Sequence, residues 1–558
     1  MSRIATRLVR SATIATLAFF ASGIGPAAAA GFPEKDKEKS GEPPLPRHFA
    51  PEEKTSVGSV TVRGQRIPYR AIAGSLVVHP KGWDDTTARI DMDAKPGKSD
   101  QRDDEHKSEK EPTPEASMFF AAYFKQGVRP ETRPITFIYN GGPGSSTVWL
   151  HMGAFGPKRI GVPNDQHMPA APYALVNNDD SLLDASDLVF IDMPGAGFSR
   201  IAGPGKEHAF WGVDQDAHAF AEFIAQFLGK YSRWNSPKYL FGESYGTTRS
   251  AVLINMLEQR AIDFNGVMLL SQIFNFALDA DGPEPNPGVD LPFELALPTY
   301  AATARYHHKL EGNQDLQALL AETEHFAMTD YALALQQGAT LSEADRATVA
   351  AKLHKYTGLP VDYIRKANLR ITGGDFEKEL LDGTDTTTGR IDTRFSGPAM
   401  DPLEKNPDYD PSTAAFASAY VSTFNDYVRN DLKYGEDRAF KPSAYAEIKH
   451  WDSSHRGPNG QNGDFNALNV MTDLATAMKY NPNLHVQLHA GYYDLATPFY
   501  EGVYEMRHLP IPDKLQKNIE YKFYESGHMV YAVESQRKAL HDSAADFIRR
   551  TVGPAPAP

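Results

Sequence analysis

The sequence contains no cysteine in its 558 residues. Catalysis by a Cys nucleophile, Cys-ligated zinc, iron–sulfur clusters and disulfides are therefore excluded in any compartment. The chain also has no H-E-x-x-H motif, and the adjacent pair His307-His308 is not spaced to converge on one ion, so we interpret it as part of a polar helix face. No glycine-rich phosphate motif stands between a strand and a helix. We therefore expect no metal and no cofactor.

Clusters of positive charge are absent as well. The chain has 71 Asp and Glu against 57 Lys and Arg, a formal charge of -14 and a pI near 5.7. Binding to nucleic acid needs a clustered excess of Lys and Arg, so this class of partner is not expected. The 41% of hydrophobic residues predicts a globular protein with an extensive core. No pattern in the sequence indicates an oligomeric state.

The N-terminus has the order of a secretory signal peptide. Arg3, Arg7 and Arg10 precede an apolar stretch from Ala12 to Ile24, and small residues end at Ala30. This stretch is too short to span a bilayer comfortably, and no later stretch is long and apolar enough to do so. We predict cleavage near Ala30, export to the periplasm or beyond, and no membrane association afterwards. An uncleaved membrane anchor is the alternative.

The rest of the chain divides by composition. Residues 1–30 form the predicted signal peptide. A polar arm rich in Glu, Lys and Pro follows over 31–55, where too little apolar surface is available to offset the entropy of ordering. We then expect the first part of a core over 56–273, a mainly helical insertion over 274–475, the C-terminal part of the core over 476–553 and a tail over 554–558. The charged run Lys98–Glu111 is interpreted as a solvated loop.

Short apolar runs alternate with helical patterns in both core parts, which predicts an α/β fold with a mostly parallel sheet covered on both faces. The expected strands are Ile135–Tyr139, Leu188–Ile191, Lys238–Phe241, Val267–Leu270, Leu484–Leu488 and Ile519–Tyr524. The expected core helices are Asp214–Leu228, Thr247–Leu257 and Val533–Val552.

Gly242-Glu243-Ser244-Tyr245-Gly246 follows one of these strands and precedes a helix. Glycines allow the sharp strand-to-helix turn that exposes a nucleophilic serine, so Ser244 is the candidate nucleophile. A bare G-x-S-x-G arises readily by chance, and its position between strand and helix is what makes it specific.

A serine hydroxyl needs a base to take its proton and a carboxylate to orient that base. Asp494 and His528 each follow a late strand, where side chains reach the same sheet edge as the serine. Taken singly, Asp494 could cap a turn before Pro498, and His528 is one of 18 histidines. Taken together, they predict the triad Ser244, Asp494 and His528.

The developing oxyanion of an acyl transfer needs hydrogen-bond donors. The backbone N–H of Tyr245 is one candidate, and that of Gly142, in the loop Asn140-Gly141-Gly142-Pro143-Gly144 after the strand Ile135–Tyr139, is the second. The alternative for this loop is an ordinary Gly/Pro turn.

Four stretches together resemble the serine carboxypeptidase family of the α/β-hydrolase superfamily, in a bacterial secreted form. They are Asn140–Ser146, Asp192–Ser199, Gly242–Gly246, and the segments around Asp494 and His528. The resemblance implies an α/β-hydrolase fold with a helical cap, peptide substrates, and a serine carboxypeptidase mechanism through an acyl-enzyme. It also implies that Asn140, Gly141 and Glu243 hold the free C-terminal carboxylate of the substrate.

Since a carboxyl can donate a hydrogen bond only when protonated, this role of Glu243 predicts an acidic pH optimum. The sequence departs from the family pattern at Ala154, where members commonly have a second Glu, and at Ser145, where a Cys often stands. The first departure keeps open a serine esterase, amidase or acyltransferase that does not recognise a terminal carboxylate. An inert binding protein on the same fold is the remaining alternative.

Overall fold

The computed structural model describes residues 49–83, 113–161, 166–281, 286–458, 460, 462–463 and 468–553. The expected signal peptide, the charged run Lys98–Glu111, the tail and most of the polar arm lie outside the described residues.

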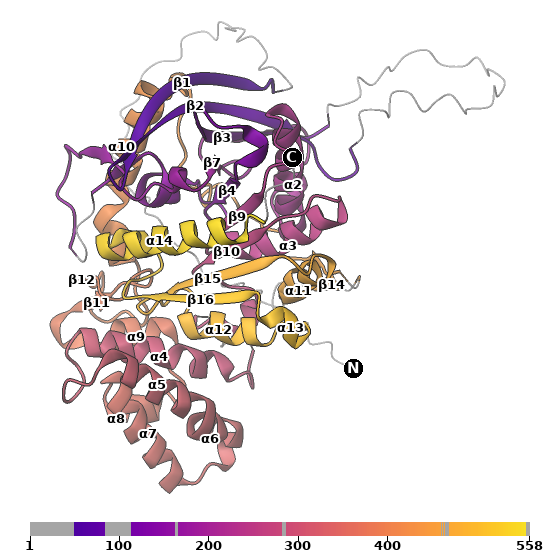
Figure 1. The fold of residues 1–558 in the computed structure, drawn as a ribbon. Helices are drawn as coiled ribbons and strands as arrows, with labels where there is room; N and C mark the ends of the chain where they lie inside the picture. Colours follow the sequence, from indigo (N-terminus) through magenta and orange to yellow (C-terminus); the bar gives the residue numbers. More distant parts are fainter. Residues whose placement is uncertain are drawn as a thin grey trace, which may run out of the picture.

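A ten-stranded sheet runs through the molecule in the order β1-β2-β3-β7-β4-β9-β10-β15-β16, and β8 pairs with β3 at one side (Figure 1). The first three strands are antiparallel, while β7, β4, β9, β10, β15 and β16 are mutually parallel. The strands of this sheet are β1 (Glu52–Val62), β2 (Gln65–Val78), β3 (Glu115–Lys125), β4 (Ile135–Tyr139), β7 (Asp187–Ile191), β8 (Arg200–Ala202), β9 (Lys238–Glu243), β10 (Gly266–Leu270), β15 (His485–Gly491) and β16 (Ile519–Tyr524).

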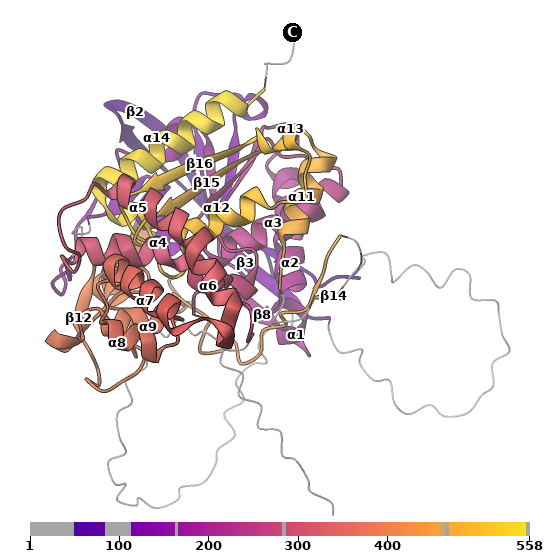
Figure 2. The same cartoon turned by 90° about the horizontal axis from the view of Figure 1, so that it is seen from below.

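Helices cover both faces of this sheet, as the α/β pattern predicts. Figure 2 shows α14 on one side of β15 and β16, and α3, α11 and α12 on the other. Apolar residues of α2, α3, α11 and α12 pack on one face, and those of α14 and α10 pack on the opposite face. The core helices are α2 (Val213–Lys230), α3 (Tyr245–Gln259), α11 (Met471–Tyr480), α12 (Phe499–Arg507) and α14 (Glu534–Thr551).

The first strand of the sheet, β1, begins earlier in the chain than the composition predicts. The polar arm was expected to extend to residue 55, but Glu52, Glu53 and Lys54 belong to β1 and pair in antiparallel register with β2. Lys230 Nζ lies 2.6 Å from a carboxylate oxygen of Glu53, and Arg438 pairs with Glu52. Backbone pairing with β2 and these two ion pairs hold the charged residues in a strand, although composition alone assigns them to an arm.

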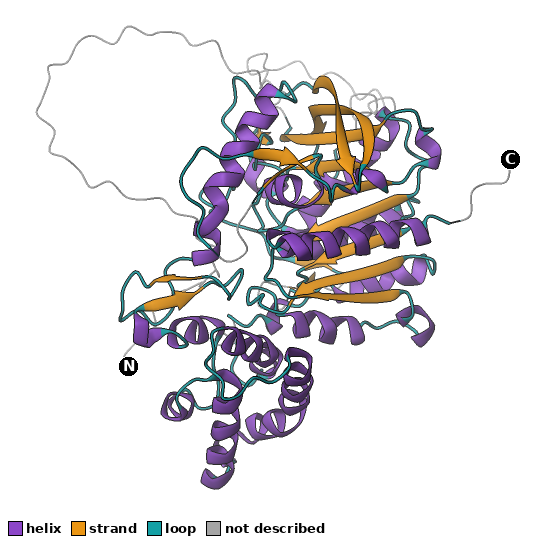
Figure 3. Ribbon diagram, turned by 60° about the vertical axis from the view of Figure 1, so that its left-hand side comes forward, coloured by secondary structure: helices purple, strands orange, loops and turns teal. Residues whose placement is uncertain are grey.

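The region expected as one helical insertion packs in two places. A first group of helices encloses its own apolar cluster beside β16 and α12 (Figures 1 and 3). Its members are α4 (Leu291–Tyr306), α5 (Leu316–Phe326), α6 (Ala332–Gln337), α7 (Glu343–Thr357), α8 (Val361–Lys366) and α9 (Gly373–Glu379). By contrast, α10 (Pro411–Asn430) contributes Phe416, Tyr420, Phe424 and Tyr427 to the core cluster that contains β3 and α14. None of the helices in the described parts of the chain is long and apolar enough to cross a membrane.

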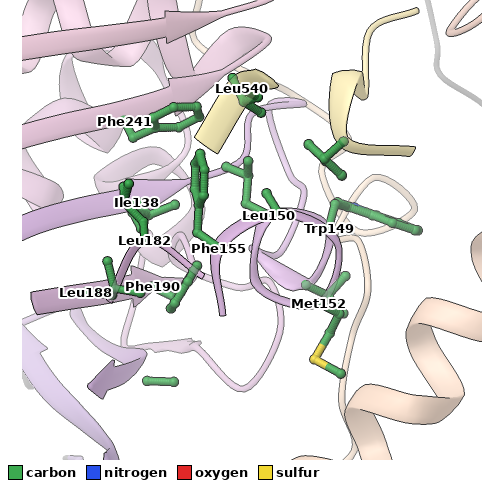
Figure 4. Packing of buried hydrophobic residues seen from close by; sticks show 14 of the residues in the cluster. Ile138, Trp149, Leu150, Met152, Phe155, Leu182, Leu188, Phe190, Phe241 and Leu540 are labelled. Carbon is green, nitrogen blue, oxygen red and sulfur yellow. The ribbon is translucent and has the colours of Figure 1, made fainter. Parts of the chain in front are cut away.

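The core directly beneath the turn after β9 is aromatic. Phe155 comes from a single π-helical turn, η3 (Leu150–Phe155), and its ring meets that of Phe241 edge to face at a centroid distance of 4.8 Å. Figure 4 shows these rings close to Leu540 of α14 and to Ile138 of β4. Such rings bury large areas and favour this edge-to-face geometry. The end of β9 therefore rests on a tightly packed support.

A fully buried ion pair joins the two helices that flank β9 and β4. Arg249 of α3 contacts Asp216 of α2 at 2.6 Å, with both side chains at 0% exposure, and Arg249 Nη1 donates to the carbonyl of Asn140 at 2.8 Å. Arg249 therefore ties the helix that begins after Ser244 to the loop that follows β4.

We expect Arg249→Leu to lower the free energy of unfolding by about 3–5 kcal/mol, because Asp216 would be left charged and unpaired in the core. Urea denaturation followed by circular dichroism measures this loss. The double variant Arg249→Leu/Asp216→Leu is the control and should lose less than the single variant. Equal losses in both variants would contradict this account.

Candidate active site

The candidate nucleophile lies at a sharp turn. β9 ends at Glu243, α3 begins at Tyr245, and Ser244 between them has φ 60° and ψ −132°. A side chain at Gly242 would clash, since a Cβ there would lie 2.3 Å from the carbonyl oxygen of Gly246. Only glycine lets the strand and helix approach this closely. The turn therefore holds Ser244 in a strained conformation of the kind found at functional sites.

The glycine loop after β4 lies directly against this turn. A Cβ on Gly141 would stand 2.4 Å from the backbone nitrogen of Tyr245, so the loop and the start of α3 are in close contact. Gly142 follows with φ 114°. Its N–H and that of Tyr245 are the two predicted oxyanion donors, and the close approach of Gly141 to Tyr245 brings their two backbone segments together.

Asp494 and His528 form a hydrogen-bonded pair at the same sheet edge. Nδ1 of His528 lies 2.8 Å from Oδ2 of Asp494, whose side chain is fully buried. Thr497 donates from its hydroxyl to Oδ2 at 2.8 Å and from its N–H to Oδ1 at 3.0 Å. Burial disfavours the charged imidazole, but Asp494 more than offsets it, so the pKa of His528 is raised above its ordinary value.

One pocket brings these groups together. Ser244 and His528 line it with Asn140, Gly141, Gly142 and Glu243, and Asp494 lies behind His528. The other lining residues are Ser145, Trp149, Ile391, Thr413, Phe416, Tyr445 and Met529. Four of these, Ile391, Thr413, Phe416 and Tyr445, belong to the region that sequence analysis assigned to the insertion.

Glu243 is buried in this pocket next to Ser244, at 4% exposure. Burial raises the pKa of its carboxyl to about 7, while the neighbouring His528 and hydrogen bonds from Tyr531 and Asn140 act in the opposite direction. The Tyr531 hydroxyl donates to Glu243 at 2.9 Å. Oδ1 of Asn140 accepts from the N–H of Leu150 at 3.2 Å, which leaves its amide nitrogen as the group available to donate. Glu243 is thus a carboxyl that holds a proton in mildly acidic solution.

Within the described residues, no group of three or more His, Asp and Glu side chains could hold a metal ion. The polar groups that line the pocket include hydroxyls, the carboxyl of Glu243, an imidazole and an amide.

Comparison with known proteins identifies the family of this chain. The family model of the serine carboxypeptidases matches residues 108–540, which is more than half of the chain. This chain belongs to the serine carboxypeptidase family. Membership makes the protein a serine-type carboxypeptidase. Among curated protein sequences, none matches the chain at a significant level.

Solved structures of other proteins are similar to this chain in fold. The prohormone-processing carboxypeptidase Kex1 of Saccharomyces cerevisiae is similar over 86% of this chain and 91% of its own, with a TM-score of 0.50 and 15% identity. A proline iminopeptidase of Mycobacterium smegmatis matches over 78% of this chain and 96% of its own, with a TM-score of 0.33 and 12% identity. Together with the parallel sheet, the likeness to Kex1 confirms the predicted α/β-hydrolase fold.

Both departures from the family pattern have a structural context. Ala154 is fully buried in the π-helical turn and does not line the pocket. Tyr531 packs against the preceding residue, Gly153, where a Cβ would lie 2.6 Å from its ring. Ser145 Oγ accepts from the indole N–H of Trp149 at 3.0 Å, and its backbone pairs with Ser443 in an isolated bridge. Backbone pairing thus joins two distant segments without a disulfide.

Sequence reasoning missed the residues that hold Asp494 and the His528 loop in place. Thr497 stands three positions after Asp494, a spacing typical of a local side-chain cap, and this signal was available. Residues 390–392 support the backbone of the His528 loop, and no local sequence pattern indicates this contact. His528 N–H donates to the carbonyl of Ile391 at 2.7 Å, and Gly527 N–H donates to Asp392 at 3.2 Å. These contacts join segments more than 130 residues apart.

The raised pKa of His528 predicts how Ser244 reacts with a fluorophosphonate probe. The labelling rate should increase from acidic pH to a plateau with a midpoint above pH 6.5, because only neutral His528 can accept the Ser244 proton. Asp494→Asn should move the midpoint to lower pH and lower the plateau by about 10⁴-fold. Stopped-time labelling across pH measures both effects.

Ser244→Ala is the control and should take up no probe. A midpoint that Asp494→Asn leaves in place would mean that Asp494 does not set the pKa of His528.

Proposed function

We propose that this protein releases the C-terminal residue of peptides through an acyl-enzyme on Ser244. Ser244 Oγ attacks the last peptide carbonyl while His528 takes its proton, and the backbone N–H groups of Gly142 and Tyr245 stabilise the oxyanion. His528 then protonates the leaving amino group, and water hydrolyses the acyl-enzyme by the reverse sequence. Asp494 holds the imidazole in the required tautomer.

The observation that carries this proposal is the buried Glu243 directly beside the nucleophile. None of the pocket's described lining residues is a Lys or Arg that could pair with a substrate carboxylate. A protonated Glu243 and the amide of Asn140 can instead donate hydrogen bonds to it, in the manner implied by the family resemblance. The elevated pKa of Glu243, about 7, supports this role because the carboxyl keeps its proton over a useful range of pH.

This arrangement couples two titrations. A free-acid substrate needs the proton on Glu243 and a neutral His528. At low pH both groups are protonated and no base is available, whereas at high pH neither is protonated and Glu243 repels the substrate carboxylate. The apparent pKa values belong to the pair, because the two groups interact directly. The pH profile of kcat/KM on free acids should be bell-shaped.

A second candidate function keeps the triad and changes the substrate. Ala154 stands where family members commonly have a second Glu, which favours an esterase, amidase or acyltransferase that does not recognise a terminal carboxylate. Tyr531 supports the first proposal, because its hydroxyl donates a hydrogen bond to Glu243 and so provides a partner in the absence of a second Glu.

We also propose that the chain is exported, as residues 1–30 indicate, and acts in the periplasm or outside the cell. Preparing the enzyme from the exported fraction tests this proposal, since the purified chain should begin near residue 31. Recovery of a chain that still begins at Met1 would contradict it.

We expect a blocked dipeptide with a free C-terminus to be cleaved faster than its C-terminal amide by about 10- to 100-fold in kcat/KM below pH 7. The amide cannot form the charge-assisted hydrogen bonds that Glu243 and Asn140 offer a carboxylate. Release of the terminal residue, measured by chromatography, gives both rates.

Ser244→Ala should abolish both reactions. Equal or faster cleavage of the amide would overturn carboxylate recognition and favour the second candidate function.

The alkaline side of the bell should depend on Glu243. Glu243→Gln should remove the fall in kcat/KM above about pH 7, since an amide donates at every pH, and should stay within about tenfold of wild type at low pH. Tyr531→Phe should move the fall to higher pH. The Tyr531 hydroxyl favours the ionised carboxyl of Glu243, so removing its hydrogen bond raises the pKa of Glu243. Steady-state kinetics from pH 4 to pH 9 measure both variants.

A matched ester substrate serves as the control for the same variants, because it carries no carboxylate and should show no alkaline fall. An unchanged fall in Glu243→Gln would mean that another group is responsible.

A further inference from the structure

A distant segment is bound across the glycine loop of the active site. We call Lys441–Tyr445 the strap. Ser146 donates to the carbonyl of Pro442 from its N–H at 3.0 Å and from its hydroxyl at 2.9 Å, and Ala444 N–H donates to the carbonyl of Gly144 at 2.8 Å. These bonds on both sides fix the strap to the loop that supplies the proposed oxyanion donor Gly142.

The last strap residue lies against the glycine loop and lines the pocket. Tyr445 lies along the glycine loop, where a Cβ on Gly144 would be 3.0 Å from its ring and a Cβ on Gly142 would be 2.5 Å from its hydroxyl oxygen. The hydroxyl is therefore in contact with Gly142. Tyr445 also lines the pocket that contains Ser244 and His528.

The Tyr445 hydroxyl makes no hydrogen bond to any residue that the structure describes, although the strap positions it firmly. Burial raises the pKa of this phenol above its ordinary value, so it remains a protonated donor throughout the working range of pH. Tyr445 is half-buried, so its hydroxyl can exchange hydration for an acceptor that a ligand supplies in the pocket. The geometry therefore leaves one donor in the pocket unused in the free protein.

We propose that the Tyr445 hydroxyl is a third oxyanion donor, beside the N–H groups of Gly142 and Tyr245. This inference rests on the proposed acyl transfer at Ser244. As Ser244 Oγ bonds to the carbonyl carbon, the π electrons move to the carbonyl oxygen, and Tyr445 donates a hydrogen bond to that oxygen. Its proton stays on the phenol. The bond reverts to a weaker one when the carbonyl re-forms and the leaving group departs with the proton from His528.

The other acceptor in the pocket would be the terminal carboxylate of the substrate. Glu243 and Asn140 already face that role, whereas contact with Gly142 places Tyr445 beside an oxyanion donor. The two assignments differ in kinetics, because an oxyanion donor acts on every acyl substrate and mainly in the transition state.

Tyr445→Phe tests the proposal on a blocked dipeptide free acid and on its matched ester. We expect kcat to fall by about 100-fold on both substrates, the lower end of the loss for one oxyanion donor, with KM changed by less than about threefold. Tyr521→Phe is the matched control. Its hydroxyl also has no partner among the described residues, it lies outside the pocket, and kcat should remain at the wild-type value.

Three outcomes would overturn the inference. They are a wild-type kcat in Tyr445→Phe, a rise in KM confined to the free acid, and a lower melting temperature that reveals a partner for the hydroxyl in the free protein. Failure of the proposed function looks different. Wild-type enzyme that cleaves the ester but not the free acid would refute carboxypeptidase action, and the ester would still measure the role of Tyr445.

Discussion

The close contact between two backbones at the carboxyl ends of β4 and β9 constrains the rest of this site. Ser244 holds a positive φ because Gly242 lets α3 turn back over β9, and Gly141 lets the loop after β4 meet the start of α3. These approaches leave no room for a Cβ. They bring Ser244 and the glycine loop together at the sheet edge, and Arg249 holds both segments through Asp216 and the carbonyl of Asn140.

The charges of the pocket follow from burial at this edge. Asp494 is fully buried and favours the charged imidazole of His528, while burial keeps Glu243 protonated until about pH 7. A neutral carboxyl beside an imidazole avoids the cost of a second buried charge and can donate to an anionic substrate. Tyr531 gives that carboxyl a hydrogen-bond partner at 2.9 Å.

Segments that lie far from β4 and β9 in the sequence also contribute to the site. Residues 390–392 hold the backbone of the His528 loop, and the strap brings Tyr445 to Gly142. Ser145 and Ser443 pair through their backbones at this junction. Hydrogen bonding to the glycine loop thus fixes in place a part of the chain that sequence analysis assigned to a helical insertion.

Sequence alone determined the α/β class, because buried strands and amphipathic helices have different apolar periods, and it placed the strands β4 and β16 at their observed bounds. Local turn chemistry also predicted Ser244 as the nucleophile, and chain order predicted Asp494 and His528 as its partners. The structure places His528 Nδ1 2.8 Å from Asp494, and His528 lines one pocket with Ser244. Tertiary structure decided the start of β1 at Glu52, the division of the insertion, the position of Tyr445 in the pocket and the contact of Tyr531 with Glu243. Each of these depends on contacts between residues far apart in the chain, which leave no periodic signal in the local sequence.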